Sequence, residues 1–239
     1  RYCYISNSDS GFFTIVSILQ KKTLMERILI AGATGHTGTR IIEILKNTEN
    51  FKPVAMIRKE DQQQIFEDME VETVVADLEG DLSHALKGID KVIFAAGSGS
   101  KTGPEKTTAV DEEGAIKLID EAKKAKVKKF VMLSAMGTDD PSKNKELEHY
   151  LTAKKKADDH LRESGITYTI VQPGRLSNDM GLAKVKLAEK LNERGEISRD
   201  DVAFIMVMSL ADPLVKNMSF EALEGEESIK TAMIELSRL

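Results

Sequence analysis

Residues 27–38 read RILIAGATGHTG, and this stretch decides the fold. It opens with a short, mostly apolar run typical of a buried strand. Three glycines follow at Gly32, Gly35 and Gly38, and apolar residues at helical spacing begin directly behind them. A strand, a glycine-rich turn and a helix in this order bring backbone N–H groups and a helix N-terminus to the phosphates of a nucleotide. The stretch therefore predicts a nucleotide-binding unit rather than an ordinary tight turn.

The same alternation of strands and helices continues along the chain. The sequence predicts strands at 27–31, 53–57, 72–76, 91–96, 128–133 and 167–171, a seventh strand near 217–222, and helices at 38–48, 61–68, 81–87, 105–126, 145–164 and 199–210. Nearly continuous apolar strands imply a sheet covered on both faces, and right-handed crossovers make it doubly wound. We predict an α/β fold with a doubly wound parallel sheet in one domain, 25–239. The irregular stretch 174–198 is expected to lie over the carboxyl edge of the sheet, as part of a short C-terminal substrate lid.

The apolar run 11–19 (GFFTIVSIL) is too short to span a bilayer. It lacks the basic start and the small-residue cleavage site of an export signal. We expect 1–24 to be a leader or vector-derived segment outside the fold, with an amphipathic N-terminal appendage as the alternative.

Composition narrows the classes of partner. Lys and Arg together number 34 against 39 Asp and Glu, a net charge of −5, so the chain lacks the basic excess of a nucleic-acid binder. Cys3 is the only cysteine, which excludes an internal disulfide and favours a cytoplasmic location. Four histidines lack the spacing of a helical metal pair, so no metal is assigned. We expect a small-molecule substrate, no nucleic acid and no membrane, and leave a homodimer open.

The end of the second strand bears on which nucleotide binds. An NAD-selective site would place an acidic residue there to hold the ribose 2′-hydroxyl, whereas this chain has Arg58 and Lys59. A guanidinium suits a 2′-phosphate. Glu60 and Asp61 follow at once, so a shifted strand end would still present a carboxylate. The sequence favours NADP over NAD.

Later strand ends carry further candidates. Asp77 and Leu78 are placed to meet the adenine edge of the nucleotide, and the small residues 95–97 to lie beside its pyrophosphate and ribose. Tyr150 and Lys154 stand at i and i+4, on one face of a predicted helix. An ammonium beside a phenol lowers the pKa of the phenol, which makes the tyrosine usable in acid–base catalysis.

Together these motifs resemble the atypical short-chain dehydrogenase/reductase superfamily, which has the NAD(P)-binding Rossmann fold. The nearest group is the small epimerase/dehydratase-like proteins related to NmrA-like proteins and biliverdin/flavin reductases. The matching stretches run from Met25 to the C-terminus: GATGHTG (32–38), AMIRK (55–59), ADLEGD (76–81), FAAGSGSKTG (94–103), VDEEGA (110–115), VMLSA (131–135), YLTAK (150–154), TIVQPGRL (169–176) and ISRDDVA (197–203).

The resemblance implies roles for individual residues. The cofactor-binding positions are Gly32, Thr34, Gly35, His36, Thr37, Gly38, Arg58, Lys59, Asp77, Leu78, Ala95, Ala96, Gly97, Lys154, Pro173 and Gly174, and the catalytic candidates are Tyr150, Lys154 and Ser134. In the superfamily the serine usually lies slightly beyond the strand tip. Here Ala135, Met136 and Gly137 follow Ser134, so Thr138 is a second candidate.

Three functions follow from this resemblance. The first is an NADP(H)-dependent reductase of a small carbonyl, quinone or flavin-like acceptor, with Tyr150 and Lys154 as the proton-donor pair. The second is a non-catalytic NAD(P)-binding redox sensor, which the departure at Ser134 favours. The third is epimerase or dehydratase chemistry on a small substrate, although the stretch after Pro173 is short for the substrate domain of a nucleotide-sugar epimerase.

Overall fold

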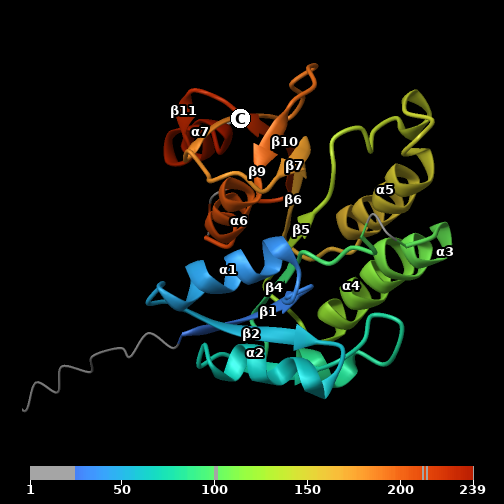
Figure 1. The fold of residues 1–239 in the computed structure, drawn as a ribbon, viewed down its shortest axis with the longest axis vertical. Helices are drawn as coiled ribbons and strands as arrows, with labels where there is room; N and C mark the ends of the chain where they lie inside the picture. Colours follow the sequence, from blue (N-terminus) through green and yellow to red (C-terminus); the bar gives the residue numbers. More distant parts are fainter. Residues whose placement is uncertain (1–24, 100–101, 212, 214, 239) are drawn as a thin grey trace, which may run out of the picture.

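The glycine-rich unit begins on the third strand from one edge of a nine-stranded sheet in the computed structural model, which describes residues 25–99, 102–211, 213 and 215–238 (Figure 1). The predicted leader lies outside the described residues. Seven strands form the parallel part of the sheet, in the order β3-β2-β1-β4-β5-β6-β10. They are β1 (Glu26–Ala31), β2 (Phe51–Ile57), β3 (Glu72–Val75), β4 (Lys91–Phe94), β5 (Lys129–Leu133), β6 (Tyr168–Pro173) and β10 (Met218–Glu224). This order confirms the doubly wound Rossmann-type sheet.

Helices cover both faces of the sheet. One face carries α1 (His36–Lys46), α6 (Arg199–Met208) and α7 (Ile229–Leu236), and the other carries α4 (Ala115–Lys124) and α5 (Glu148–Glu163) (Figure 1). Successive residues of β1 enter two different cores, because side chains alternate across a strand. Ile28 packs in the core that includes Ile41 of α1, whereas Leu29 packs in the core that includes Leu118 of α4. Burial on both sides explains why the strands are apolar throughout.

Three predicted helices differ in detail from the structure. The stretch expected at 105–126 begins with a short α3 (Pro104–Lys106), continues as a π-helical segment (Thr107–Gly114) and then becomes α4. The stretch expected at 61–68 is a 3₁₀ turn (Glu60–Gln62) followed by α2 (Gln63–Glu67), and 81–87 contains only the 3₁₀ turn Ser83–Leu86. A further 3₁₀ turn, Pro141–Lys143, precedes α5.

The stretch 174–198, expected to be irregular, contains three strands. β7 (Arg175–Ser177) and β9 (Glu196–Ser198) form a separate parallel pair. β8 (Lys184–Ala188) joins the main sheet antiparallel to β10, and β11 (Glu227–Ser228) pairs with its outer edge. Through β8, part of the stretch 174–198 is therefore built into the main sheet, which is mostly rather than wholly parallel.

The glycine-rich turn is held by close backbone contacts. Gly32 has a φ of +86°, a conformation that favours glycine. A Cβ added at Gly38 would lie 2.1 Å from the carbonyl oxygen of Gly32. The absence of a side chain at Gly38 thus lets the first turn of α1 rest directly on the glycine-rich turn.

Gly38→Ala is expected to lower the free energy of unfolding by about 2 kcal/mol or more, because the added methyl group must push α1 away from the turn. Thermal unfolding measures the effect. Gly80→Ala is the matched control, since a Cβ at Gly80 would meet its nearest neighbour, the Asp77 carbonyl oxygen, at 3.5 Å. Equal melting temperatures for the two variants would contradict the prediction.

Candidate functional site

The carboxyl edge of β1 forms a cradle for a phosphate group. Gly35 precedes α1 without a capping side chain, and the first turn of α1 contains no acidic residue. The backbone N–H groups at this end are therefore free to bind an anion. A Cβ at Gly32 would lie 2.5 Å from the backbone nitrogen of Ala96, so the turn also fits tightly against the segment after β4. Of the neighbouring predicted positions, Thr34 and His36 are exposed and Thr37 is buried.

The basic pair follows the neighbouring strand at the same edge. β2 ends at Ile57, and both Arg58 and Lys59 are exposed. Their backbone N–H groups donate to Oε1 of Gln62, at 2.9 Å and 3.2 Å. Gln62 thereby fixes the turn and leaves both cationic side chains without a carboxylate partner among the described residues.

The other predicted nucleotide positions lie at the ends of β3 and β4. Asp77 is exposed, and its side chain accepts a hydrogen bond from the backbone of Glu79 at 3.0 Å. Leu78 is buried, directly against Gly114 of the π-helical segment. Ala95, Ala96 and Gly97 follow β4 without large side chains. The end of β3 lies beside that of β2, and the end of β4 beside that of β1, because these strands are parallel neighbours.

Lys154 of α5 is buried within an ion pair that the sequence did not reveal. Its Nζ lies 3.1 Å from Oδ1 of the fully buried Asp111 and donates to the carbonyl oxygen of Leu133 at 3.1 Å. Asp111 also accepts a hydrogen bond from the backbone N–H of Ser98 at 2.9 Å. An ammonium group has three N–H donors. The carbonyl oxygen of Leu133 engages one of those of Lys154. Asp111 faces the ammonium as an ion pair without a hydrogen bond to its Oδ1, so a further donor remains for a ligand.

Tyr150 lies on the same side of α5, half-buried, with its ring centroid 5.9 Å from Nζ of Lys154. The expectation of a lowered pKa is wrong. Burial raises the pKa of Tyr150 above its ordinary value, and the charges of Asp111 and Asp158 act in the same direction against the ammonium of Lys154. Burial alone would lower the pKa of Lys154, but Tyr150 and Asp111 raise it overall. The pair is thus a neutral phenol beside an ammonium.

Ser134 follows β5 and belongs to a buried hydrogen-bond network. Its Oγ donates to Oδ2 of Asp158 at 2.6 Å. Thr138 donates to the same oxygen at 3.4 Å and accepts a hydrogen bond from Gln172 at 2.7 Å. Oδ1 of Asp158 has no hydrogen-bond partner in the described structure. Ser134 and Thr138, the two candidates for the catalytic serine position, therefore donate to the same carboxyl group.

Sequence reasoning missed both buried carboxyl groups, although α5 carried a signal for one of them. Asp158 stands four residues after Lys154 and eight after Tyr150, on one helical face. An acidic residue on an inward face is unusual enough to mark a polar site. Asp111 had no such signal, because its burial depends on the π-helical segment.

A cavity of about 1180 Å³ opens beside these residues. Ser134, Tyr150, Pro173 and Gly174 contribute to its wall, so the predicted catalytic and nicotinamide-side positions share one space. A Cβ at Gly174 would lie 2.5 Å from the carbonyl oxygen of Gly195, which brings the insertion against the end of β6. The apolar part of the cavity wall includes Met136, Leu147, Leu151, Pro173 and Leu176.

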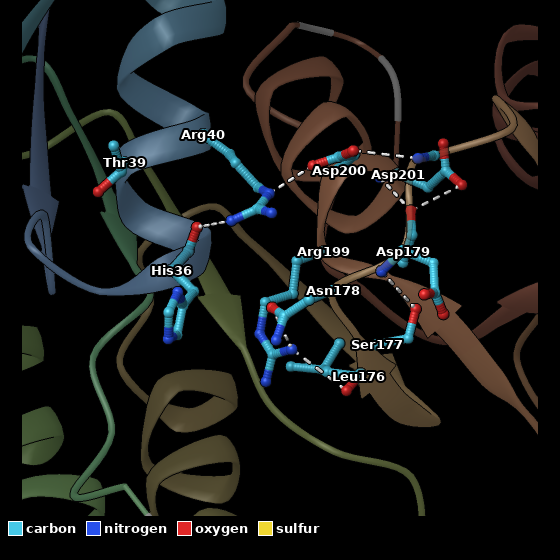
Figure 2. Close-up of polar contacts among 12 residues, drawn as sticks. His36, Thr39, Arg40, Leu176, Ser177, Asn178, Asp179, Arg199, Asp200 and Asp201 are labelled. Carbon is cyan, nitrogen blue, oxygen red and sulfur yellow. Dashed lines mark hydrogen bonds and ion pairs between the residues drawn. The ribbon is translucent and has the colours of Figure 1, made fainter.

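The helix of the glycine-rich turn is tied to α6, which begins at the cavity (Figure 2). Arg40 of α1 forms an ion pair with Asp200 and also donates to the carbonyl oxygen of His36 at 2.8 Å. Asp200 accepts a hydrogen bond from the backbone of Gly181 at 3.0 Å. Figure 2 shows the neighbouring Arg199 extending toward the end of β7. The cradle and the cavity are thus joined through the first turn of α6.

The pH dependence of stability tests the network around Asp158. Burial raises the pKa of Asp158 from 3.8 to about 6. The folded chain therefore binds this proton more tightly than the unfolded chain. Stability contributed by the proton is full below pH 3.8 and is lost as pH rises through about 6. The free energy of unfolding of the wild type relative to Asp158→Asn should fall on the order of 3 kcal/mol over this window.

Urea unfolding between about pH 4 and pH 7 measures this difference. Asp159→Asn is the control, because Asp159 is half-buried and pairs with Lys155 and Arg162. A difference between wild type and Asp158→Asn that stays constant with pH would contradict the prediction.

Comparisons with known proteins agree with this geometry. The profile of the NAD(P)H-binding family matches residues 32–213. An uncharacterized sugar epimerase, YhfK, of Bacillus subtilis (strain 168) is 40% identical, covering 88% of this chain and all of that protein. Sanguinarine reductase of Eschscholzia californica is 28% identical and covers 86% of this chain and 91% of that protein.

A solved structure supports the same relationship. A putative NAD-dependent epimerase/dehydratase from Bacillus halodurans superposes with a TM-score of 0.85 at 41% identity, over 88% of this chain and all of that one. Among the described residues, no helix is long and apolar enough to cross a membrane. The cradle at β1, the strand order and these relatives together show that the chain belongs to the NAD(P)H-binding family of atypical short-chain dehydrogenase/reductase proteins.

Proposed function

We propose that the protein is an NADP(H)-dependent reductase of a small carbonyl, quinone or flavin-like acceptor. The observation that carries the proposal is the phenol of Tyr150, which lines the cavity next to the buried ammonium of Lys154. A proton donor, a cation and room for an acceptor therefore occur together at the carboxyl ends of the central strands. The related sanguinarine reductase is named for a reductase activity, which agrees with this choice.

Different residues would bind the cofactor and transfer the proton. The glycine-rich turn at Gly32–Gly38 and the side chain of Arg58 would hold the phosphates of NADP(H), and the bound cofactor would supply the hydride. Tyr150 would donate its hydroxyl proton to the acceptor oxygen. Its raised pKa keeps the phenol protonated at neutral pH, as a donor requires. The remaining N–H of Lys154 would hold the nicotinamide ribose.

Ser134 has a limited part in this scheme. Its hydroxyl proton is committed to Asp158 at 2.6 Å. While that bond is made, Ser134 offers a ligand only its oxygen, as a hydrogen-bond acceptor. Proton transfer to the acceptor is therefore assigned to Tyr150 and not to Ser134.

Epimerase chemistry is the second candidate, because a relative that is 40% identical is named a sugar epimerase. An epimerase returns the hydride to its substrate and consumes no nicotinamide overall. Net oxidation of NADPH by an acceptor separates the two functions.

NADP(H) is expected to bind about tenfold more tightly than NAD(H), a difference of about 1.4 kcal/mol. The reason is the side chain of Arg58, which is exposed at the end of β2 and has no acidic partner in the part of the chain that the structure describes. Calorimetric titration of Arg58→Ala should show most of this preference lost.

The control for this prediction is Glu60→Gln with Asp61→Asn, which removes the two carboxylates that follow. The nucleotide preference should survive in this double variant. Equal affinities for the two nucleotides in the wild type, or loss of the preference in the control, would refute the assignment to Arg58.

Tyr150→Phe is expected to lower NADPH oxidation by about 10²-fold while changing the NADP⁺ affinity only a few-fold, since a positioned acid contributes that much to turnover. Activity is measured spectrophotometrically with a panel of quinones, aldehydes and flavins. Tyr168→Phe is the matched control, because Tyr168 packs beside the core at the start of β6.

Oxidation of NADPH that is unchanged in Tyr150→Phe would remove Tyr150 from the chemistry. A wild-type protein that binds NADP⁺ but oxidises NADPH with no member of the panel would favour the redox-sensor function instead.

A further inference from the structure

The charged side chains that line the cavity are mostly paired with one another. Arg175 forms an ion pair with Glu196 across the β7–β9 pair. Lys190 lies 2.7 Å from Glu221 and 3.0 Å from Asp139. These pairs leave little net charge on this part of the wall.

The remaining carboxylates of the wall are also paired. Asp140 lies 3.2 Å from Lys143, and Glu193 lies 2.5 Å from Lys186. Every carboxylate that lines the cavity therefore has a basic partner within the described residues.

Two arginines of the cavity wall have no carboxylate partner in the described part of the chain. They are Arg194 and Arg199, which flank the short strand β9. One terminal nitrogen of Arg199 donates to the carbonyl oxygen of Leu176 at 3.2 Å and to Oδ1 of Asn178 at 2.9 Å (Figure 2). The rest of its guanidinium keeps its donors available. Arg199 is thus held in place by neutral groups, and no carboxylate among the described residues pairs with it.

We infer that Arg194 and Arg199, on the two sides of β9, are the anion-binding groups of the cavity wall, and that the acceptor is a molecule with an apolar body and a carboxylate or phosphate group. Guanidinium groups suit both anions because they present paired donors. The apolar residues of the same wall, such as Met136 and Leu151, would contact the body of the acceptor. This inference rests on the proposed function in taking the cavity as the acceptor site.

A pair of fluorescent dyes tests the inference without any turnover. 1-Anilinonaphthalene-8-sulfonate carries an anionic group, and N-phenyl-1-naphthylamine has the same aromatic body without it. Both are titrated into the full chain at saturating NADP⁺, which occupies the nucleotide site. In Arg194→Gln/Arg199→Gln the dissociation constant of the sulfonate should rise about tenfold or more, while that of the neutral dye changes less than about twofold.

Arg175→Gln/Glu196→Gln is the matched control, since it removes one arginine of the same wall together with its acidic partner. It should leave the affinity for both dyes within about twofold. Retained binding of the neutral dye shows that the variant cavities are folded.

Three results would overturn the inference. They are no binding of the sulfonate dye by the wild type, equal loss of both dyes in Arg194→Gln/Arg199→Gln, and a loss of NADP⁺ affinity in that variant, which would assign these arginines to the phosphates of the nucleotide. None of them depends on NADPH oxidation, so the inference and the proposed reductase function fail separately.

Discussion

The buried ammonium of Lys154 is the constraint around which the site is organised. A charge inside a protein needs partners, and its partners here come from distant parts of the chain. Asp111 lies on the π-helical segment after β4, and the carbonyl oxygen of Leu133 ends β5. Asp111 in turn fixes the backbone of Ser98. One ion pair thus sets the relative positions of α5 and the segments that follow two central strands.

The two sides of the site differ in how their polar groups are used. On the nucleotide side, the backbone N–H groups at the N-terminus of α1 and the guanidinium of Arg58 are hydrogen-bond donors that remain available to a ligand in the described structure. On the cavity side, most charges cancel locally, and Arg199 is positioned by neutral oxygens. A dinucleotide brings its own charges and needs donors, whereas an apolar body needs a wall with little charge. The distribution of paired and unpaired groups therefore follows the chemistry of the two ligands proposed.

The parallel strands could be predicted because both of their faces are buried, which makes them apolar throughout. β8 was not predicted, because only one of its faces is buried. Its lysines, Lys184 and Lys186, face solvent and break the apolar run, so only the alternation with Val185 marked a strand. The π-helical segment has no readable period of its own in the sequence. The pairing of Asp111 with Lys154 follows from that segment and could not be read from spacing.

The residues proposed to bind the cofactor could be predicted from the sequence, whereas the pKa of Tyr150 could not. Glycines, a strand end and a basic pair act through the backbone or from the surface, so their meaning is local. The pKa of Tyr150 depends on burial and on Asp111 and Asp158 as well as on Lys154, and its direction reversed once those neighbours were known.

The place of β8 in the sheet has a consequence for the order in which the chain can fold. Within the described structure β8 pairs only with β10 and β11, so it has no neighbour until the chain has been synthesised past Glu224. The strands from β1 to β6, by contrast, can pair as soon as β6 leaves the ribosome. During synthesis the nucleotide cradle therefore can assemble first, and the edge of the sheet formed by β10, β8 and β11 is the last part to close.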